Sequence, residues 1–245
     1  MKTGERWFSP RLERDASLVR WGNMGAPVLI FPTAGGDAEE IERHQVVDTL
    51  GPLLRKGELK VYSCDSLAGR AMLQGEGDAR HRMRLLDRFQ QYVYHEVVPA
   101  IRRDCRSHDM GIVVAGASIG AFNSLAVLCR YPDAFLRALC MSGTYDLTPF
   151  LEATASEEFY LASPLHYLAD LGGPLLDLLR TRFVLLASGE GDYEDIGQSW
   201  KMAEVLGRKG IPNRVESWGP DWPHEWHTWR QMLWTYRDGL MAGGG

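Results

Sequence analysis

The chain has 245 residues, 45% of them hydrophobic, and a formal net charge of −5. This length and composition can bury a sizeable core without disulfide or metal staples. The acidic balance, without a basic stripe or a polybasic segment, argues against nucleic acid and membrane surfaces as partners. No run of about 18 apolar residues exists, and no apolar segment follows residues 1–6 as a signal peptide would require. The four cysteines show no CxxC or CxxH spacing, so we expect no metal site and a reduced, cytoplasmic protein.

Strands and helices are predicted to alternate along most of the chain. Residues 5–19, which mix aromatic and charged side chains, could form a first β-ribbon over a sheet edge. Apolar runs and helical periodicity predict strands at 27–31, 59–64, 110–115, 136–142, 183–187 and 211–218, and helices at 41–54, 79–103, from 121, 198–209 and 228–240. The helix at 79–103 contains Pro99, which should kink or end it. The alternation predicts an α/β protein whose doubly wound, mostly parallel sheet carries helices on both faces, in one domain over residues 1–245. Residues 147–182 are either a small cap over the sheet or an ordinary crossover.

The most informative stretch is Gly116-Ala117-Ser118-Ile119-Gly120, which separates an apolar strand from a helical pattern. A serine at such a strand–turn–helix apex has its hydroxyl in the open, and glycines two residues away on each side let strand and helix approach. The pattern predicts Ser118 as a nucleophile and the backbone N–H of Ile119 as an oxyanion donor. The alternative is a tight turn in which the serine is merely small and polar.

A glycine-rich loop, Pro32-Thr33-Ala34-Gly35-Gly36-Asp37, follows the strand at 27–31. Its backbone amides could cradle a phosphate or supply half of an oxyanion hole, but no nucleotide-binding motif is present. We expect the second oxyanion donor at Thr33 or Ala34. Asp37 is expected to cap the helix that follows.

An acid and a base should follow the serine in that order, on loops after later strands. The loop Gly189-Glu190-Gly191-Asp192 directly follows a buried strand. Asp192 is the preferred acid and Glu190 the alternative, while Glu194 and Asp195 could cap the next helix. Solvated loop charges are the remaining interpretation of these carboxylates.

The base is expected after the last strand, where His224 and His227 both occur. We prefer His224 as the base, with His227 as a pocket-lining or capping residue. His166 precedes the acid loop and therefore fits the order badly. Trp222 and Trp226 flank His224, and these two tryptophans are expected to line an apolar pocket, although packing is the default for aromatic side chains near a final helix.

The combination of these segments resembles the serine esterases of the α/β-hydrolase fold, near the branch of esterase D, the antigen 85 acyltransferases and the feruloyl esterases. The similarity rests on the loop at 31–37, the serine turn, the Gly189–Asp192 loop, Lys209-Gly210-Ile211-Pro212, and a His-Glu-Trp then Trp-Arg ending at 224–230. The chain departs from many hydrolases in having Pro32-Thr33 where they carry His-Gly. The resemblance implies hydrolysis of carboxylic esters through an acyl-serine intermediate, without a metal or organic cofactor, and it supports His224 over His227.

The sequence therefore predicts a carboxylesterase acting on a small-molecule ester through Ser118, Asp192 and His224. The same residues would serve an acyltransferase or thioesterase, and a non-catalytic binding protein that keeps the fold is a third hypothesis. The acyl and alcohol groups stay open, as does the oligomeric state, for which aromatic residues near the C-terminal helix could supply a homodimer face.

Overall fold

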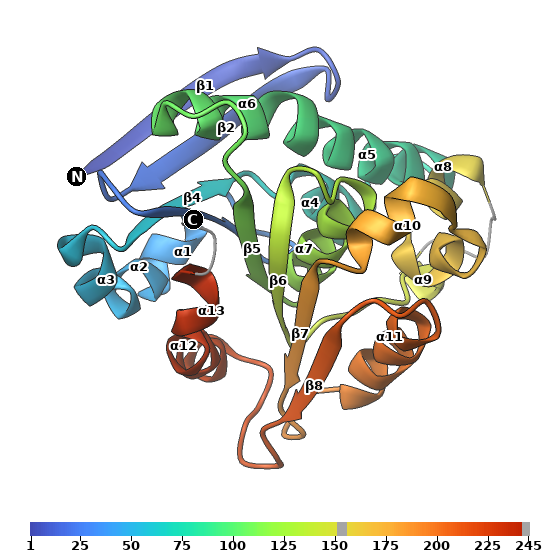
Figure 1. Ribbon diagram of the computed structural model, residues 1–245. Helices are drawn as coiled ribbons and strands as arrows, with labels where there is room; N and C mark the ends of the chain where they lie inside the picture. Colours follow the sequence, from blue (N-terminus) through green and yellow to red (C-terminus); the bar gives the residue numbers. More distant parts are fainter. Residues whose placement is uncertain (151–155, 242–245) are drawn as a thin grey trace.

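The computed structural model describes residues 1–150 and 156–241, and one eight-stranded sheet runs through them (Figure 1). The spatial order of the strands is β1-β2-β4-β3-β5-β6-β7-β8. Their bounds are β1 Lys2–Ser9, β2 Arg14–Trp21, β3 Ala26–Phe31, β4 Leu59–Cys64, β5 Ile112–Ala117, β6 Phe135–Met141, β7 Phe183–Ser188 and β8 Asn213–Ser217.

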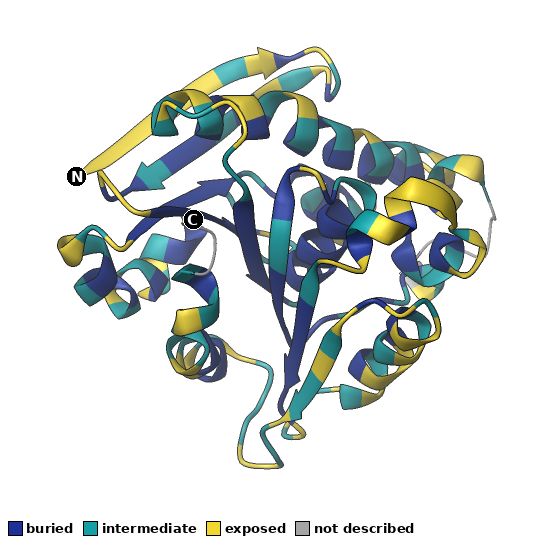
Figure 2. Cartoon of the chain, viewed as in Figure 1, coloured by how far each residue is buried: buried dark blue, intermediate teal, exposed yellow. Residues whose placement is uncertain are grey.

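The six strands from β4 across to β8 pair in parallel, whereas β1 and β2 form an antiparallel hairpin on the edge of β4. Every residue of β3, β4 and β5 is buried, as expected for parallel strands covered on both faces. Most of β1 is exposed (Figure 2). The predicted ribbon and the mostly parallel sheet are thus confirmed.

Helices cover both faces of the sheet and enclose two hydrophobic cores. One core contains residues from α4 Leu67–Gln74, α5 Ala79–Tyr92, α6 Val98–Cys105, α7 Ile119–Arg130, α8 Glu157–Ala162, α9 Pro164–Tyr167, α10 Gly173–Leu179 and α11 Ile196–Arg208. The other contains residues from α1 Glu40–Arg43, α2 Val46–Thr49, α3 Gly51–Lys56, α12 Trp226–Thr235 and α13 Arg237–Met241. This is the predicted doubly wound architecture.

Two predicted helices are interrupted, for identifiable backbone reasons. The helix expected at 41–54 is split into α1, α2 and α3, because Gln45 has a φ of 61° and Pro52 begins a new helix. The helix expected at 79–103 contains a π-helical turn at Val93–Val97, immediately before Pro99. Proline lacks an N–H and its ring clashes with the carbonyl of residue i−4, so a widened turn relieves both problems.

The segment at 147–182 packs against the side of the sheet that carries α5. Helix α8 lies along α5, and Gln90 Nε2 of α5 donates a hydrogen bond to the Ala162 carbonyl at 2.6 Å. Helix α9 contacts α7. Residues 151–155 of this segment lie outside the described residues. A cap role for the segment stays a prediction.

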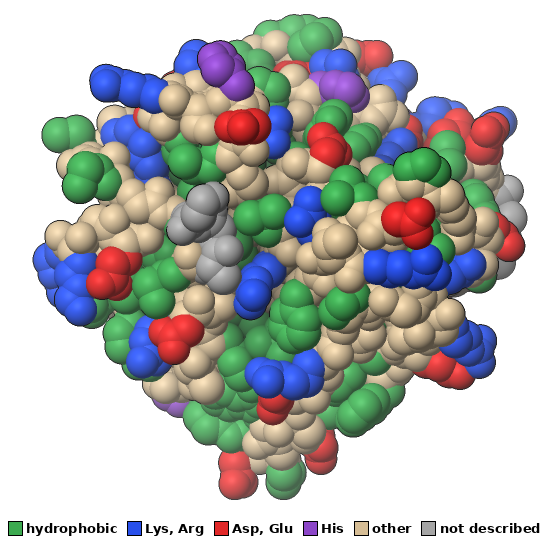
Figure 3. Space-filling view, viewed as in Figure 1, with side chains coloured by type: hydrophobic (Ala, Val, Ile, Leu, Met, Phe, Trp, Pro, Cys, Tyr) green, Lys and Arg blue, Asp and Glu red, His purple; other side chains and the backbone are tan. Residues whose placement is uncertain are grey.

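The surface in Figure 3 carries Lys and Arg side chains interspersed with Asp and Glu. None of the helices in the described ranges has the length and apolar character that a membrane crossing demands.

Candidate active site

Ser118 lies at a sharp turn between β5 and α7. Its backbone has φ 57° and ψ −122°, a conformation that is rare outside glycine. Neither neighbouring glycine could carry a side chain: a Cβ at Gly116 would lie 2.4 Å from the Gly120 backbone, and one at Gly120 would lie 2.6 Å from the Phe31 carbonyl oxygen. The predicted turn therefore forms, and its candidate nucleophile, Ser118, has a strained backbone.

The Ser118 turn opens onto a cavity of about 380 Å³. Its walls are formed by the loop that follows β3, by α4, by the serine turn and by the segment that follows β6. The lining residues are Ala34, Gly69, Met72, Leu73, Ser118, Ile119, Thr144 and Leu147. No charged side chain is among them, so the cavity suits a neutral and mainly apolar group.

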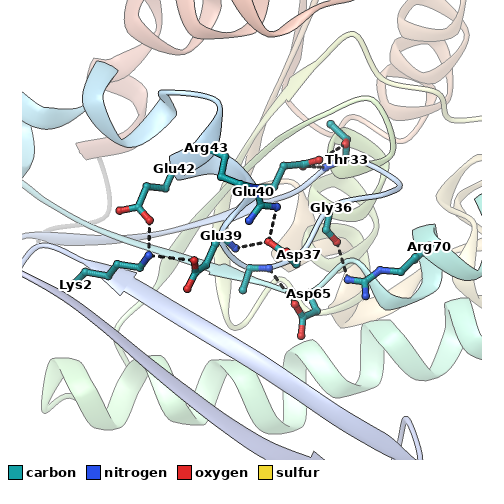
Figure 4. Close-up of polar contacts among 11 residues, drawn as sticks. Lys2, Thr33, Gly36, Asp37, Glu39, Glu40, Glu42, Arg43, Asp65 and Arg70 are labelled. Atoms are coloured by element: carbon teal, nitrogen blue, oxygen red, sulfur yellow. Dashed lines mark hydrogen bonds and ion pairs between the residues drawn. The ribbon is translucent and has the colours of Figure 1, made fainter.

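Ile119 and Ala34 border this cavity together with Ser118, which places both where an oxyanion hole would be. Ile119 is the first residue of α7, and first-turn amides have no acceptor within their own helix. Thr33, the other expected donor, is engaged elsewhere. Its N–H donates to Glu40 Oε2 at 2.7 Å and its hydroxyl donates to Glu40 Oε1 at 2.8 Å (Figure 4). The Thr33 amide is thus not free, and the structure favours Ala34.

The loop that holds Ala34 is fixed by polar contacts on both sides. Arg70 Nη2 donates to the Gly36 carbonyl at 3.1 Å (Figure 4). The Ser66 N–H donates to the same carbonyl at 3.2 Å. Asp37 Oδ1 accepts from the Glu39 N–H at 2.9 Å and from Arg43 Nη2 at 2.8 Å. The N-cap of α1 is Glu39, so the cap expected at Asp37 is wrong by two residues. These contacts hold the loop in place before any substrate arrives.

The carboxylate that faces His224 is that of Glu194, and not that of Asp192, the predicted acid. Glu194 Oε2 lies 3.5 Å from His224 Nδ1, and the Glu194 side chain is only 1% exposed. Asp192 is exposed, and its contact with His224 is between backbones, the His224 N–H donating to the Asp192 carbonyl at 2.9 Å. Glu190 is also exposed and bonds the Ser217 hydroxyl.

A local reversal of the chain explains why the Glu194 side chain faces His224. Tyr193 has a φ of 61°, and the Glu194 N–H donates to the Gly191 carbonyl at 3.1 Å, so the backbone folds back after Asp192. Glu194 then points inward. Asp195 alone caps α11, accepting from the Gly197 N–H at 3.0 Å. One capping carboxylate is enough for a helix. The presence of two carboxylates before α11 was therefore the sequence signal that one of them, Glu194, has a different partner.

His224 is 23% exposed and lies edge-on to Trp229, with ring centroids 4.9 Å apart. His227, by contrast, is exposed and stacks on Trp222 at 6.0 Å. Trp226 stacks on His44 at 4.3 Å. Trp222 and Trp226, which were expected to line the pocket, are not among the residues that line the cavity at Ser118.

The remaining candidates for chemistry have structural partners. His166 Nδ1 lies 2.7 Å from the Ser163 hydroxyl, and burial lowers the pKa of His166. Burial raises the pKa of the Cys64 and Cys129 thiols and brings that of Cys140 to about 12, so these thiols stay protonated near neutral pH. Across the described ranges, no three His, Cys, Asp or Glu side chains gather as a metal site would require.

Ser118, Glu194 and His224 follow β5, β7 and β8, which are parallel strands of one sheet, so the three residues lie beyond the same edge of the sheet. Main-chain hydrogen bonds connect the strand ends: the Ser118 N–H donates to the Met141 carbonyl at 3.0 Å, and the Ser142 N–H donates to the Ala187 carbonyl at 2.8 Å. Ser118 and His224 make no hydrogen bond in the part of the chain that the structure describes. Catalytic hydrogen bonds are often long before substrate binds, so this arrangement is compatible with a working site.

Comparison with known proteins identifies the family. The sequence model of the family described as Putative esterase matches residues 75–238, more than half of the chain. The chain belongs to this esterase family. Membership assigns it to the hydrolases of carboxylic esters and confirms the resemblance to the serine esterases. A sequence search among curated proteins finds no significant match.

Solved structures of several other proteins superpose on nearly the whole chain. A ferulic acid esterase has a TM-score of 0.76 and 15% identity, covering 100% of this chain and 98% of that one. An S-formylglutathione hydrolase from Agrobacterium tumefaciens has a TM-score of 0.75 and 11% identity, covering 100% and 96%. MPT51 of Mycobacterium tuberculosis has a TM-score of 0.70 and 14% identity, covering 98% of each chain. At these identities the similarity establishes the α/β-hydrolase fold.

Proposed function

We propose that this esterase hydrolyses neutral carboxylic esters of small molecules through an acyl-serine intermediate, with Ser118 as nucleophile, His224 as base and Glu194 as acid. One observation carries the proposal. Ser118 has the strained, positive-φ backbone of a nucleophile turn and borders an uncharged cavity together with Ile119 and Ala34. The buried Glu194 carboxylate beside His224 supplies the orienting group that a serine–histidine pair needs.

In the first half-reaction, His224 takes the proton of the Ser118 hydroxyl as its oxygen bonds to the carbonyl carbon. The carbonyl oxygen becomes an oxyanion, which the N–H groups of Ile119 and Ala34 stabilise by roughly 3 kcal/mol each. Collapse of this intermediate breaks the ester C–O bond, and the imidazolium returns the proton to the departing alcohol. Water then repeats the sequence on the acyl-serine and releases the acid. Glu194 stabilises the imidazolium in both halves without being protonated.

The cavity suggests which part of the substrate the chain binds. Met72, Leu73 and Leu147 offer apolar contacts, and no charged lining residue could pair with an ionised group. We therefore propose a neutral apolar acyl or alcohol group as the occupant. An alcohol or thiol acceptor in place of water would give acyl transfer with the same residues, and product analysis with added acceptors separates the two outcomes.

A fluorophosphonate probe tests the proposal directly, because only an activated serine attacks its phosphorus at a useful rate. Purified protein is labelled and digested, and the adduct is located by mass spectrometry, beside Ser118→Ala and His224→Ala. We expect an adduct on Ser118 in the natural chain, none in Ser118→Ala, and labelling at least about 100-fold slower in His224→Ala. His227→Ala is the matched control and should label at the natural rate. Folded protein that takes no label would contradict the proposal and favour a binding protein.

A further inference from the structure

Ser142, the residue that follows β6, has an unusual backbone and a buried side chain. Its φ is 49°, in the region that glycine occupies without strain, and the residue is 3% exposed. Ser142 lies just beyond the last residue of β6, Met141, and is not part of a helix. Strained backbone of this kind is found at functional positions, so it points to a role for the Ser142 hydroxyl.

The Ser142 hydroxyl connects the two ends of the acid–base pair. It donates to Glu194 Oε1 at 2.5 Å and accepts from Trp229 Nε1 at 3.0 Å. Trp229 in turn lies edge-on against the His224 ring. Because the indole N–H can only donate, it occupies a lone pair of the hydroxyl and directs the single hydroxyl proton toward Glu194.

The hydrogen bond from Ser142 determines which carboxylate oxygen of Glu194 faces His224. With Oε1 held by Ser142, Oε2 faces His224 Nδ1 at 3.5 Å, and the Ser188 hydroxyl lies 3.2 Å from the same oxygen. Rotation of the carboxylate would break the Ser142 bond. The two serines follow or end neighbouring strands, so the sheet itself sets the orientation of the acid.

We propose that Ser142, oriented by Trp229, is a positioning residue that aims the Glu194 carboxylate at His224. This inference rests on the proposed function, since it assigns a role within the same acid–base pair. Ser142 acts only through Glu194. Its removal should therefore lower kcat, leave KM nearly unchanged, and matter only while residue 194 is a carboxylate.

A double-mutant cycle measured with p-nitrophenyl butyrate tests this dependence. Ser142→Ala keeps the Cβ and the backbone strain but removes the hydroxyl. In the natural background we expect kcat to fall about 10- to 100-fold, as for loss of a hydrogen bond to a charged group, with KM within about twofold. In the Glu194→Gln background the same change should cost less than about threefold, because there is no charge left to aim.

Two further variants complete the test. Trp229→Phe removes the indole N–H while keeping an aromatic ring, and it should lower kcat about 3- to 10-fold in the natural background only. Ser63→Ala removes a buried strand hydroxyl that has no partner in the described part of the chain, and it should leave kcat within about twofold. If Ser142→Ala does not fold, the same comparison with Trp229→Phe decides.

The outcomes separate this inference from the proposed function. Equal losses in both backgrounds, or an unchanged kcat in Ser142→Ala beside an inactive Ser118→Ala, would overturn the positioning role alone. Undiminished turnover in Ser118→Ala would overturn the proposed function, and the positioning role with it.

Discussion

Asp104 and Glu194 are two carboxylates that lie near different strands of the sheet and have different kinds of partner. Asp104, in α6, meets fixed cations: Arg20 Nη1 lies 2.7 Å from Oδ1, and Lys60 Nζ lies 2.7 Å from Oδ2. The Tyr62 hydroxyl also donates to Oδ2 at 2.5 Å. The charge of Asp104 is neutralised permanently by this cluster, which ties α6 to β2 and β4.

Glu194 has no such cation. Within residues 1–150 and 156–241, no Lys or Arg forms an ion pair with it, and its partners are two serine hydroxyls and His224. A carboxylate that faces a histidine gains a full counter-charge when that histidine takes a proton. Asp104 thus has permanent cationic partners, whereas the proposed role of Glu194 requires a partner that becomes charged only during the reaction.

The largest expected effect comes from neutralising Glu194. Glu194→Gln keeps the shape of the side chain but removes the charge that stabilises the imidazolium, so kcat should fall about 10³-fold or more. Steady-state kinetics with p-nitrophenyl butyrate measure this loss. The variant should remain folded, because no buried cation loses its partner.

Asp192→Asn is the matched control, two residues away on the same loop. Its exposed side chain should contribute little, and kcat should stay within about threefold. A large loss in Asp192→Asn with little loss in Glu194→Gln would assign the acid to Asp192 and end the contrast drawn between the two carboxylates.

Asp104→Asn should show the reverse pattern, with a loss of stability and little loss of activity. Lys60 is only 6% exposed and would be left without its carboxylate. Breaking a buried pair is costly, but the Asp104 side chain is 29% exposed, so we expect about 1–3 kcal/mol from the free energy of unfolding. Urea denaturation measures the stability, and kcat of the folded variant should stay within about twofold. A folded variant with greatly reduced kcat would mean that Asp104 also serves the site.

The serine turn and the strands were predictable because their signals are local. Gly116 and Gly120 bracket Ser118 in the sequence, and steric contacts of those same glycines require the turn in the structure. Fully buried parallel strands such as β3 appear as continuous apolar runs. In each case, the residues that determine the local structure are close together in the sequence.

The orientation of Glu194, the engagement of the Thr33 amide and the tryptophan contacts depend on residues that are not neighbours in the sequence. A positive φ at Tyr193, an uncommon state for tyrosine, turns Glu194 inward toward Ser142, more than 50 positions earlier. The Thr33 N–H donates to Glu40, seven residues further along the chain, and no motif in the sequence marks that contact. Trp226 packs on His44, from the other half of the chain. Periodicity and motif spacing carry no information about such pairings.

The smallest expected effect is a pH dependence that belongs to Asp104 alone. Partial burial by itself would raise the pKa of Asp104, but hydrogen bonds from Lys60 and Tyr62 outweigh this and lower it. A carboxyl with a lowered pKa in the folded state adds stability that is complete above its unfolded pKa of about 3.9 and is lost as the pH falls through the folded pKa. The difference in unfolding free energy between the natural chain and Asp104→Asn should therefore be constant from about pH 5 to 7 and shrink below about pH 4. Urea denaturation of both proteins at pH 6 and pH 3 measures it, and the other acidic groups cancel because both chains share them. A difference that stays constant down to pH 3 would mean that the cations around Asp104 hold its position without stabilising its charge.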